Sequence, residues 1–391
     1  MGSCIHHTVD DEAYFDDFTR RAGAQRVPLD GSLELTHRCN LRCVHCYLGD
    51  QKKIRPHRRD ELSTAEIKQL LDELATAGTL NFTFTGGDPM LRKDFPELYE
   101  YAVHKGFLVT IFCDGALISP KVMAIFDRFA PRKVEVSIYG ATAQTYEDIT
   151  QVKGSYQRCI DGLDALKSHG FRFTLKTVLM QGNRHELEQM RNLADHYGVP
   201  FYFDTAIFPC LPHADNGKSA APANGIHGIP VVLGNARQAV TDYRIDPKEA
   251  AKLHLRDPKR VEEMADLYVR SQKFPKSDDL YKCSAGKSTF HIDPYGNLQA
   301  CTISTNGGYN IREGGFMAGW NGPIAALRSR KARPGSSCSS CDKQALCGGC
   351  PAFFYAENNA GDVKSNYTCE TTHLIVEGLS EAIRARMETS E

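Results

Sequence analysis

Three cysteines lie close together near the N-terminal end of the chain, in the stretch THRCNLRCVHCYL (36–48). Cys39, Cys43 and Cys46 are spaced to bind one metal centre, whereas a structural zinc or an electron-transfer cluster normally takes four protein ligands. Three thiolates on a four-iron cluster leave one iron without a protein ligand, and a small molecule can bind that iron. The alternative is a zinc site that borrows a distant ligand. We therefore expect an open metal centre here.

The C-terminal part of the chain contains a second group of cysteines. Of the 14 cysteines in the sequence, seven belong to it: Cys283, Cys301, Cys338, Cys341, Cys347, Cys350 and Cys369. Tight spacing with intervening turns suits the ligation of compact clusters, and two structural zinc sites are the alternative. In a reducing compartment, clustered thiols are more often metal ligands than disulfides.

Composition excludes several functional classes. Hydrophobic residues make up 41% and charged residues 24%, as in ordinary globular proteins, and the net charge of −1 gives no overall field that favours nucleic acid or an anionic membrane. No apolar run is long enough to span a bilayer, and the acidic start lacks the order of a signal peptide. We expect a cytoplasmic protein with no nucleic-acid or membrane partner.

Short apolar runs alternate with amphipathic stretches between residues 32 and 208. The expected strands are 32–36, 80–85, 107–112, 133–140, 171–180 and 199–208. The expected helices are 63–78, 94–106, 119–130, 155–170 and 185–198. Ser63 with Glu66 predicts a capping box, and Ser119 predicts an N-cap. Regular alternation implies parallel strands with right-handed crossovers, and six units predict an α/β fold with a partial (β/α)6 barrel of the TIM type.

Four regions follow from this pattern. Residues 1–31 are an N-terminal extension, 32–208 the partial barrel, 209–279 a linker and helical bridge, and 280–391 a small cysteine-rich domain. The last region is rich in turns, such as the hairpin expected for HIDPYGNLQAC (291–301), and shows little apolar periodicity. We therefore expect metal, more than an apolar core, to stabilise it. The cysteine triplet directly follows the first strand, where β/α barrels place their chemistry.

The triplet resembles a known signature. Cys39-x3-Cys43-x-His45-Cys46 is similar to the motif of radical S-adenosylmethionine (radical SAM) enzymes, in which the cofactor binds the open iron of a [4Fe–4S] cluster. The resemblance implies that His45 packs near the adenine of the cofactor. The alternation of strands and helices is consistent with the fold of that family.

A second element supports the resemblance. TGGDP follows the second expected strand, where radical SAM enzymes carry Gly-Gly-Glu-Pro, so Gly86, Gly87, Asp88 and Pro89 are implied cofactor-binding residues. Adjacent glycines expose backbone groups to a close ligand. The carboxylate would accept hydrogen bonds from the methionyl ammonium, although aspartate is one methylene shorter than the glutamate of the family.

Two later strand ends match cofactor contacts of the family, and one lysine is a further candidate. Ser137, in VEVSIYG, occupies the position that approaches the ribose. Asp114 stands in CDG where relatives often have Thr-Asn-Gly, and Lys176 would pair with the cofactor carboxylate. A serine at a strand end and a lysine at a rim are also ordinary features of barrels without such a role.

The second cysteine group resembles the SPASM extension of radical SAM enzymes, which holds two auxiliary iron–sulfur clusters. The resemblance assigns Cys338, Cys341, Cys347 and Cys369 to one cluster, and Cys283, Cys301 and Cys350 to the other. The last short gap is two residues, Gly348-Gly349, where three is usual. The second set has no fourth cysteine, so this cluster would be open with three protein ligands, or an aspartate, Cys210 or the substrate would complete it. Cys210 is also a candidate catalytic hydrogen donor.

The resemblance implies an enzyme that reductively cleaves S-adenosylmethionine to a 5′-deoxyadenosyl radical and abstracts hydrogen from a peptide or protein side chain. Ribosomal peptide maturation would yield a crosslink, thioether, decarboxylation or oxidation. The implied partners are a precursor peptide or protein, a separate leader-peptide-binding protein and a reductant of the flavodoxin or ferredoxin type. Alternatives are a radical SAM enzyme acting on a tetrapyrrole side chain or another small metabolite, and a non-catalytic iron–sulfur electron carrier.

One basic run remains outside this scheme. KKIRPHRR (52–59) directly follows the triplet loop. It could dock an acidic peptide or supply substrate contacts, and the alternative is a solvated loop.

Overall fold

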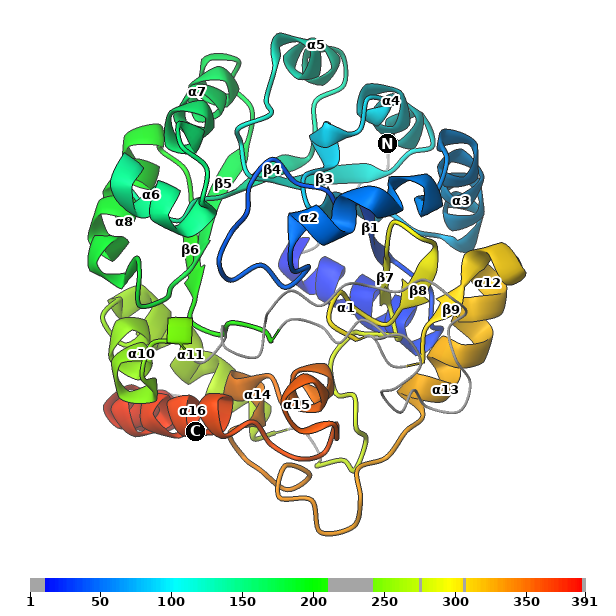
Figure 1. Ribbon diagram of the computed structural model, residues 1–391. Coiled ribbons are helices and arrows are strands. Elements are labelled where there is room, and N and C mark those ends of the chain that lie inside the picture. The colour runs from blue at the N-terminus through cyan, green and yellow to red at the C-terminus, as the bar shows by residue number, and fades with distance from the viewer. Residues whose placement is uncertain (1–10, 210–241, 274–275, 305–306, 389–391) are drawn as a thin grey trace, which may run out of the picture.

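The computed structural model describes residues 11–209, 242–273, 276–304 and 307–388 (Figure 1). Among these residues, nine strands form one sheet in the order β6-β5-β4-β3-β2-β1-β7-β8-β9. The first six are parallel to their neighbours: β1 (Asp30–Thr36), β2 (Asn81–Gly86), β3 (Leu108–Cys113), β4 (Lys133–Ser137), β5 (Phe173–Val178) and β6 (Phe201–Asp204). The expected α/β fold with a partial barrel of parallel strands is confirmed.

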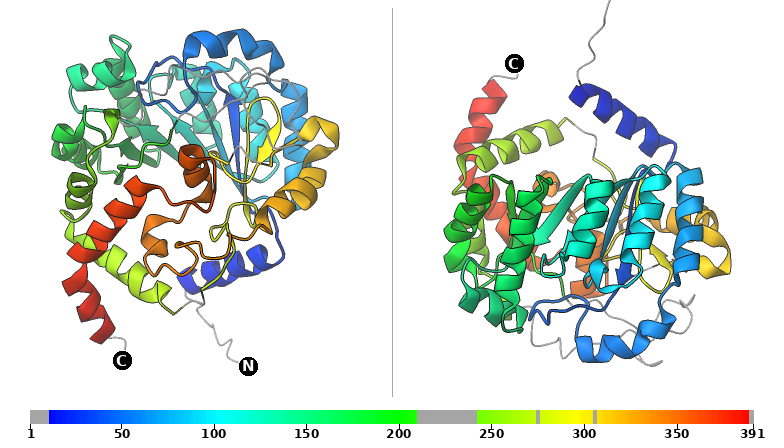
Figure 2. Two further views of the ribbon diagram at one scale, coloured as in Figure 1. Left: turned by 60° about the horizontal axis from the view of Figure 1, so that its bottom comes forward. Right: turned by 90° about the horizontal axis from the view of Figure 1, so that it is seen from above.

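Helices cover the outer face of this curved sheet (Figures 1 and 2). They are α3 (Thr64–Ala77), α4 (Phe95–His104), α5 (Pro120–Arg128), α7 (Ser155–Ser168) and α8 (Leu187–Tyr197). The capping box of Ser63 and Glu66 is confirmed, as is the Ser119 cap, whose hydroxyl accepts a hydrogen bond from the backbone of Val122. The expected helix ends are therefore set by local chemistry.

The strands alternate between two environments. Leu33, Phe84 and Leu175 point toward the helices and are fully buried in one continuous apolar core. Burial of such a side chain contributes about 1.5–3 kcal/mol relative to exposure. The intervening positions, among them Ser137 and Lys176, face the concave side. This period of two is what places polar groups inside the barrel.

The first part of the C-terminal region joins the barrel. Strand β7 (Thr289–Ile292) pairs in parallel with β1, and β8 (Asn297–Gln299) and β9 (Tyr309–Asn310) extend the sheet in antiparallel fashion. The expected hairpin is confirmed, with Gly296 at φ +88° in its turn. The apolar side chains of Phe290, Phe316 and Trp320 belong to the main core, so an apolar core also stabilises this part. Stabilisation of the cysteine-rich residues by metal stays a prediction.

The described α-helices that follow β6 in the chain are α10 (Pro247–His254), α11 (Pro258–Ser271), α12 (Gly315–Gly319), α13 (Ala325–Arg328), α14 (Gln344–Cys347), α15 (Pro351–Asn358), α16 (Asn366–Gly378) and α17 (Ser380–Glu388). Those labelled α14, α15 and α16 in Figure 1 lie across the ring from β3 and β4. Several helices were not expected from the sequence: α1 (Asp11–Ala24), α6 (Ala143–Thr150) and the pair α2 (Gln51–Ile54) and η1 (Arg55–Asp60). None of the described helices is long and apolar enough to cross a membrane.

Candidate active site

A cavity of about 620 Å³ lies on the concave side of the sheet, where the parallel strands end. The implied site residues that line it are Cys39, Cys43, His45, Cys46, Gly86, Gly87, Asp114, Ser137, Lys176 and Cys301. Asp88 and Pro89 are buried and are not part of its lining. Cys210 lies outside the described residues. The structure thus brings most of the implied cofactor residues to the wall of one cavity.

The loop that carries the three thiols is held by backbone contacts. The backbone N–H of Arg42 donates to the carbonyl of Thr150 at 2.9 Å, at the end of α6. On the other side, the side chain of Gln51 accepts from the backbone N–H of Cys39 at 2.8 Å and donates to the carbonyl of His37 at 3.0 Å. Gln51 is the first residue of α2 and is only 4% exposed. Helices α2 and α6 therefore fix the position of Cys39 and its loop.

The two glycines of TGGDP let the end of β2 press against this loop. A Cβ on Gly86 would lie 2.2 Å from the carbonyl oxygen of Thr36, and one on Gly87 would lie 2.2 Å from that of Arg38. Gly86 also has φ +131°, which favours glycine. The N–H of Gly87 donates to Thr36 O at 2.8 Å, and the N–H of Asp88 donates to Arg38 O at 3.0 Å. The glycines thus have a packing role that sequence reasoning missed.

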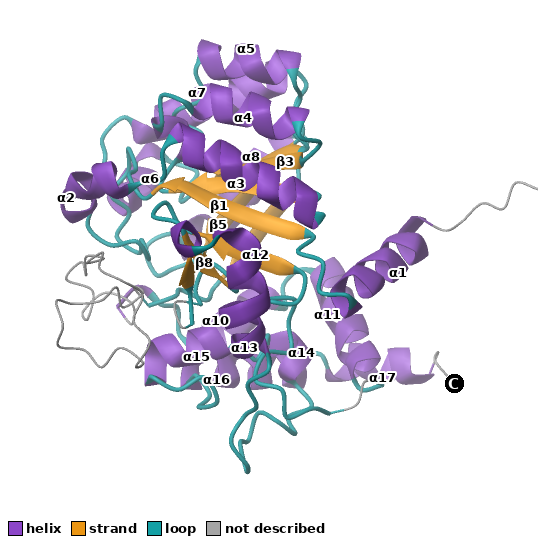
Figure 3. Cartoon of the chain, turned by 90° about the vertical axis from the view of Figure 1, so that its right-hand side faces the viewer, coloured by secondary structure: helices purple, strands orange, loops and turns teal. Residues whose placement is uncertain are grey.

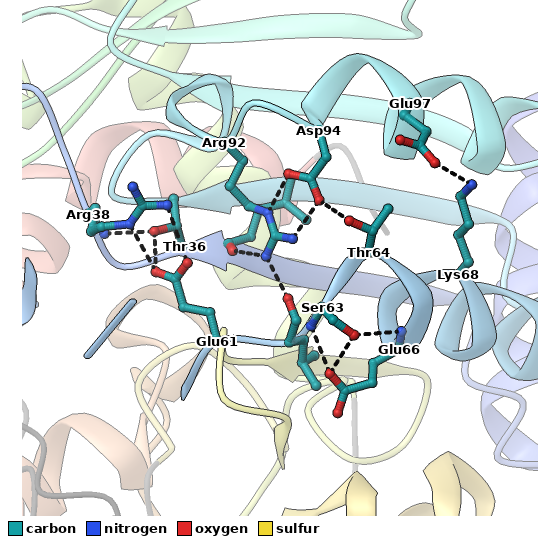
Figure 4. Close-up of polar contacts among 12 residues, drawn as sticks. Thr36, Arg38, Glu61, Ser63, Thr64, Glu66, Lys68, Arg92, Asp94 and Glu97 are labelled. Atoms are coloured by element: carbon teal, nitrogen blue, oxygen red, sulfur yellow. Dashed lines mark hydrogen bonds and ion pairs between the residues drawn. The ribbon is translucent and has the colours of Figure 1, made fainter. Parts of the chain in front are cut away.

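Two ion pairs also support these segments (Figure 4). Arg38 pairs with Glu61 through two nitrogens, each 3.3 Å from a carboxylate oxygen. Arg92 pairs with Asp94 at 2.6 Å and 2.9 Å and also donates to the carbonyl of Leu62 at 2.8 Å. Because Arg92 is almost fully buried, these bonds tie the segment after TGGDP to the start of α3.

Asp88 connects two strand ends. Its carboxylate accepts from the backbone N–H of Met90 at 2.9 Å and from that of Asp114 at 3.1 Å. The Asp114 carboxylate accepts from the N–H of Ala116 at 2.8 Å and lies 3.9 Å from the thiol of Cys39. Burial raises the pKa of both carboxyl groups, and for Asp88 the neighbouring Asp114 raises it further. The contact of the Asp88 carboxylate with the ammonium group of the cofactor stays a prediction.

His45 supplies a buried polar atom without a partner. Its ring packs edge-on against Tyr139, with centroids 4.8 Å apart. Among the described residues its Nδ1 has no hydrogen-bond partner, and burial lowers the pKa of the ring to about 4, so the imidazole is neutral. Buried polar atoms are rarely left unpaired, so a ligand in the cavity is a natural source of the missing partner. The position fits the polar cofactor that the resemblance implies.

Ser137 and Lys176 are neighbours in the register of β4 and β5. The Lys176 ammonium donates to the Glu135 carboxylate at 3.1 Å and stands 3.1 Å from the centre of the Phe112 ring. Burial lowers the pKa of Lys176, while Glu135 opposes that change. Lys176 therefore reaches the cavity already partnered, and its bond to a cofactor carboxylate stays a prediction.

Glu34 is a polar residue that sequence reasoning missed. Its buried carboxylate accepts from His37 Nε2 at 2.6 Å and from the Tyr47 hydroxyl at 2.6 Å, and it lies 3.6 Å from His291 Nε2. His291 Nδ1 in turn is 2.8 Å from the hydroxyl of Ser32, which lines the cavity. Burial acts to raise the pKa of Glu34, but the two histidines hold it well below its usual value. An acidic residue inside the apolar run SLELT was the available signal.

The cysteines of the second group fall into two neighbourhoods. The thiol of Cys301 interacts electrostatically with those of Cys283 and Cys350. The second neighbourhood consists of Cys338, Cys341, Cys347 and Cys369. Burial raises the pKa of Cys301 to about 12 and that of Cys347 to about 11.

These neighbourhoods bear on the kind of metal centre. Within the described ranges, no three His, Cys, Asp or Glu side chains converge closely enough to hold a single metal ion. The donor set of both neighbourhoods consists of thiols, which zinc and iron–sulfur clusters both accept. A bound cluster would hold the thiols as thiolates, since its positive charge favours the deprotonated form.

Comparisons with known proteins support the resemblance to radical SAM enzymes. Residues 33–194 match the Radical SAM superfamily. The chain is 26% identical over 326 residues to the AdoMet-dependent heme synthase of Methanosarcina barkeri, a match covering 83% of this chain and 91% of the relative. It is 28% identical over 337 residues to the mycofactocin maturase MftC of Mycobacterium ulcerans, covering 83% and 84%.

The fold is shared through the C-terminal region. The structure of native anSMEcpe with bound AdoMet and the Cp18Cys peptide aligns with a TM-score of 0.65 at 14% identity, covering 93% of this chain and 99% of that one. Residues 33–194 therefore carry a radical SAM domain, and the comparisons support an enzyme that uses S-adenosylmethionine and a [4Fe–4S] cluster.

Proposed function

We propose that this enzyme modifies a side chain of a peptide or protein. The observation that carries the proposal is the single cavity lined both by the triplet thiols and by Cys301 of the second group. At about 620 Å³ it has the size of sites that enclose a ligand of several hundred daltons, here a cofactor next to a substrate residue. Similarity to the mycofactocin maturase MftC over 83% of the chain supports a maturation reaction.

Two groups of residues would bind the cluster and the cofactor. Cys39, Cys43 and Cys46 would hold the cluster, and the walls formed by His45 and the backbone of Gly86 would hold the cofactor. When bound, cluster and cofactor supply one-electron cleavage of a carbon–sulfur bond and removal of a hydrogen atom from the substrate. The protein positions the substrate carbon and excludes water.

The remaining contacts to the cofactor are proposed because these residues line the same cavity or lie directly behind its wall. Asp114 and Ser137 border the cavity, and Lys176 does so with Glu135 as its partner. Asp88 and Pro89 would act from behind the wall, by shaping the segment that follows β2. Cys210 is kept as a candidate ligand or hydrogen donor.

Two auxiliary iron–sulfur clusters are proposed for the C-terminal region. The neighbourhood of Cys338, Cys341, Cys347 and Cys369 would hold one, and that of Cys283, Cys301 and Cys350 the other. An aspartate, Cys210 or the substrate would complete the second. We propose a barrel at 32–208, a bridge at 209–279 and a cluster domain at 280–391. The enzyme would act in the reducing cytoplasm. A separate protein would bind the leader peptide of the substrate.

A tetrapyrrole is the second candidate substrate. It is favoured by the likeness to an AdoMet-dependent heme synthase, which spans 91% of that relative. A porphyrin carries propionate side chains, and Lys176 offers a cation on the cavity wall. Binding of a porphyrin by the reconstituted protein, seen as a Soret band, would favour this candidate over a peptide.

Iron counting and product analysis test the proposal. Anaerobically reconstituted protein should contain about twelve iron atoms if three four-iron clusters form, and about four if only the triplet binds one. With S-adenosylmethionine and dithionite it should release 5′-deoxyadenosine, and replacing Cys43 with alanine should abolish this. A precursor peptide encoded beside the gene should gain or lose mass during turnover. Release of no nucleoside by the wild-type protein would refute the proposal.

A further inference from the structure

We propose that the basic face of α2 and η1 docks the acidic one-electron carrier protein that reduces this enzyme. The basic face is defined as Lys52, Lys53, Arg55, Arg58 and Arg59. The inference rests on the proposed function, because only a reductive reaction needs such a carrier. The carrier, a flavin or iron–sulfur protein, gives up one electron, and the thiolate-bound centre gains it.

The first argument is charge. Residues 50–60 contain these five cations against two carboxylates, Asp50 and Asp60, although the whole chain has a net charge of −1. All five cationic residues are exposed. In the part of the chain that the structure describes, no ion pair involves Lys52, Arg55, Arg58 or Arg59. A local surplus of unneutralised positive charge attracts an acidic protein and raises its association rate.

Two cations beside the second cysteine group are already paired. Lys331 pairs with Asp279 at 2.6 Å, and Arg333 pairs with Asp362 at 2.6 Å. These side chains have neighbouring carboxylates, so an acidic partner gains less from them than from the basic face.

The second argument is position. Figure 3 shows α2 beyond the ends of the strands, on the side where the triplet loop lies. Leu48, Gly49 and Gln51 line the cavity, so the segment that begins α2 is part of the cavity wall. Gln51 also hydrogen-bonds the backbone of Cys39 directly. The segment from Leu48 to Gln51 therefore lies between the basic face and the three thiols. The hydrogen bond between Gln51 and Cys39 connects the two sides of this segment.

Local contacts hold the start of the basic face. The buried side chains of Gln51 and Ile54 anchor α2, while Asp50 caps it by accepting from the N–H of Lys52 at 2.8 Å. Pro56 lies in the first turn of η1. Cations on a folded helix lose less conformational entropy on docking than cations on a loose loop.

The test compares two triple variants with the same charge change. Lys52→Glu, Arg55→Glu and Arg59→Glu reverse the basic face. Lys248→Glu, Lys252→Glu and Arg256→Glu reverse three exposed cations on and after α10, which lies away from α2 in Figures 1 and 3. Both holoenzymes receive S-adenosylmethionine and either a reduced flavodoxin or dithionite, and 5′-deoxyadenosine is measured.

We expect the reversed basic face to lower kcat/KM for flavodoxin about 10- to 100-fold at low ionic strength, with a smaller effect at high salt. The rate with dithionite should stay within about twofold of wild type, and the α10 variant should follow wild type with both reductants. A glutamine version of the basic-face triple keeps the test valid if the glutamates impair folding. Binding of oxidised flavodoxin, measured by titration, should weaken in parallel.

Three results would overturn the proposal. The basic-face variant could keep flavodoxin-driven turnover within about twofold of wild type. The α10 variant could also lose as much flavodoxin-driven turnover as the basic-face variant. Equal loss with flavodoxin and dithionite would show that the face serves the substrate or the loop instead. Absence of nucleoside with dithionite in wild type would refute the proposed function, whereas the flavodoxin titration would still report on docking.

Discussion

Replacing Gly87 with alanine should separate the triplet loop from the end of β2. The added Cβ would lie 2.2 Å from Arg38 O, 2.5 Å from its carbonyl carbon and 2.6 Å from His37 O. All three atoms belong to the backbone, so no flexible side chain can move aside. Carbon–oxygen contacts normally exceed about 3.3 Å, and the two segments must therefore move apart by about 1 Å.

The expected cost can be worked from the contacts. Overpacking of this kind costs about 1–3 kcal/mol. The shift also breaks the hydrogen bonds from Gly87 N to Thr36 O and from Asp88 N to Arg38 O, each contributing about 0.5–1.5 kcal/mol. Together, the free energy of unfolding should fall by about 2–6 kcal/mol. If Gly87 served only the close approach of a ligand, the loss would appear only with cofactor bound.

The assay is urea unfolding of protein without cofactors, followed by tryptophan fluorescence. Trp320 is the single tryptophan of the chain and is buried in the main core, so its signal reports that core. Gly322→Ala is the matched control, because nothing lies within 4 Å of a Cβ at that exposed position. The reasoning fails if Gly87→Ala unfolds within about 0.5 kcal/mol of the control.

Three further predictions concern the supports of the site. Arg92→Ala should lower stability in urea by about 3–5 kcal/mol, since it leaves buried carbonyls and a carboxylate without their donor. Arg312 lowers the pKa of Glu66 to about 2. The ionised Glu66 carboxylate therefore stabilises the fold above pH 4.5, and this stabilisation is lost as the pH falls toward 2. Glu66→Gln should flatten that part of the curve of stability against pH. Arg26→Ala removes a cation 4.9 Å from the Trp320 ring and should shift tryptophan emission to the red while lowering stability by about 1–3 kcal/mol.

Each of these predictions has its own control. Arg128→Ala removes an exposed ion pair with Glu100, so it should change stability by less than about 0.5 kcal/mol, and an equal effect of Arg92→Ala would contradict the argument. Arg312→Gln should reproduce the pH behaviour of Glu66→Gln; a curve unchanged by either would contradict the assigned pKa. An unaltered emission spectrum of Arg26→Ala would show that the cation does not affect the ring.

Local chemistry made much of the barrel predictable. The capping box at Ser63, the cap at Ser119 and the glycine after α8 each act within four residues, so the sequence pattern reports them directly. The six strands follow from runs of apolar residues with polar alternates. Helix α6 was missed because its eight residues follow a strand closely and contain few apolar positions.

The site was predictable only where a motif carried it. The triplet and TGGDP identified the cavity wall, but the clamp between Gly87 and Arg38 depends on distances between segments far apart in sequence. The same applies to Glu34, whose partner His291 is more than 250 residues away. Neither contact leaves a periodic or local trace, because tertiary pairing creates it.

The pairing of β1 with β7 makes the two halves of the chain inseparable. Strand β1 carries the triplet at its end, and its second edge is covered only by a strand that arrives some 250 residues later. A chain shortened before residue 280 would bare that edge, a surface prone to aggregation, and would remove Phe290, Phe316 and Trp320 from the apolar interior. Modular exchange of the cysteine-rich half between relatives should therefore fail unless β7 and its hairpin stay with the barrel.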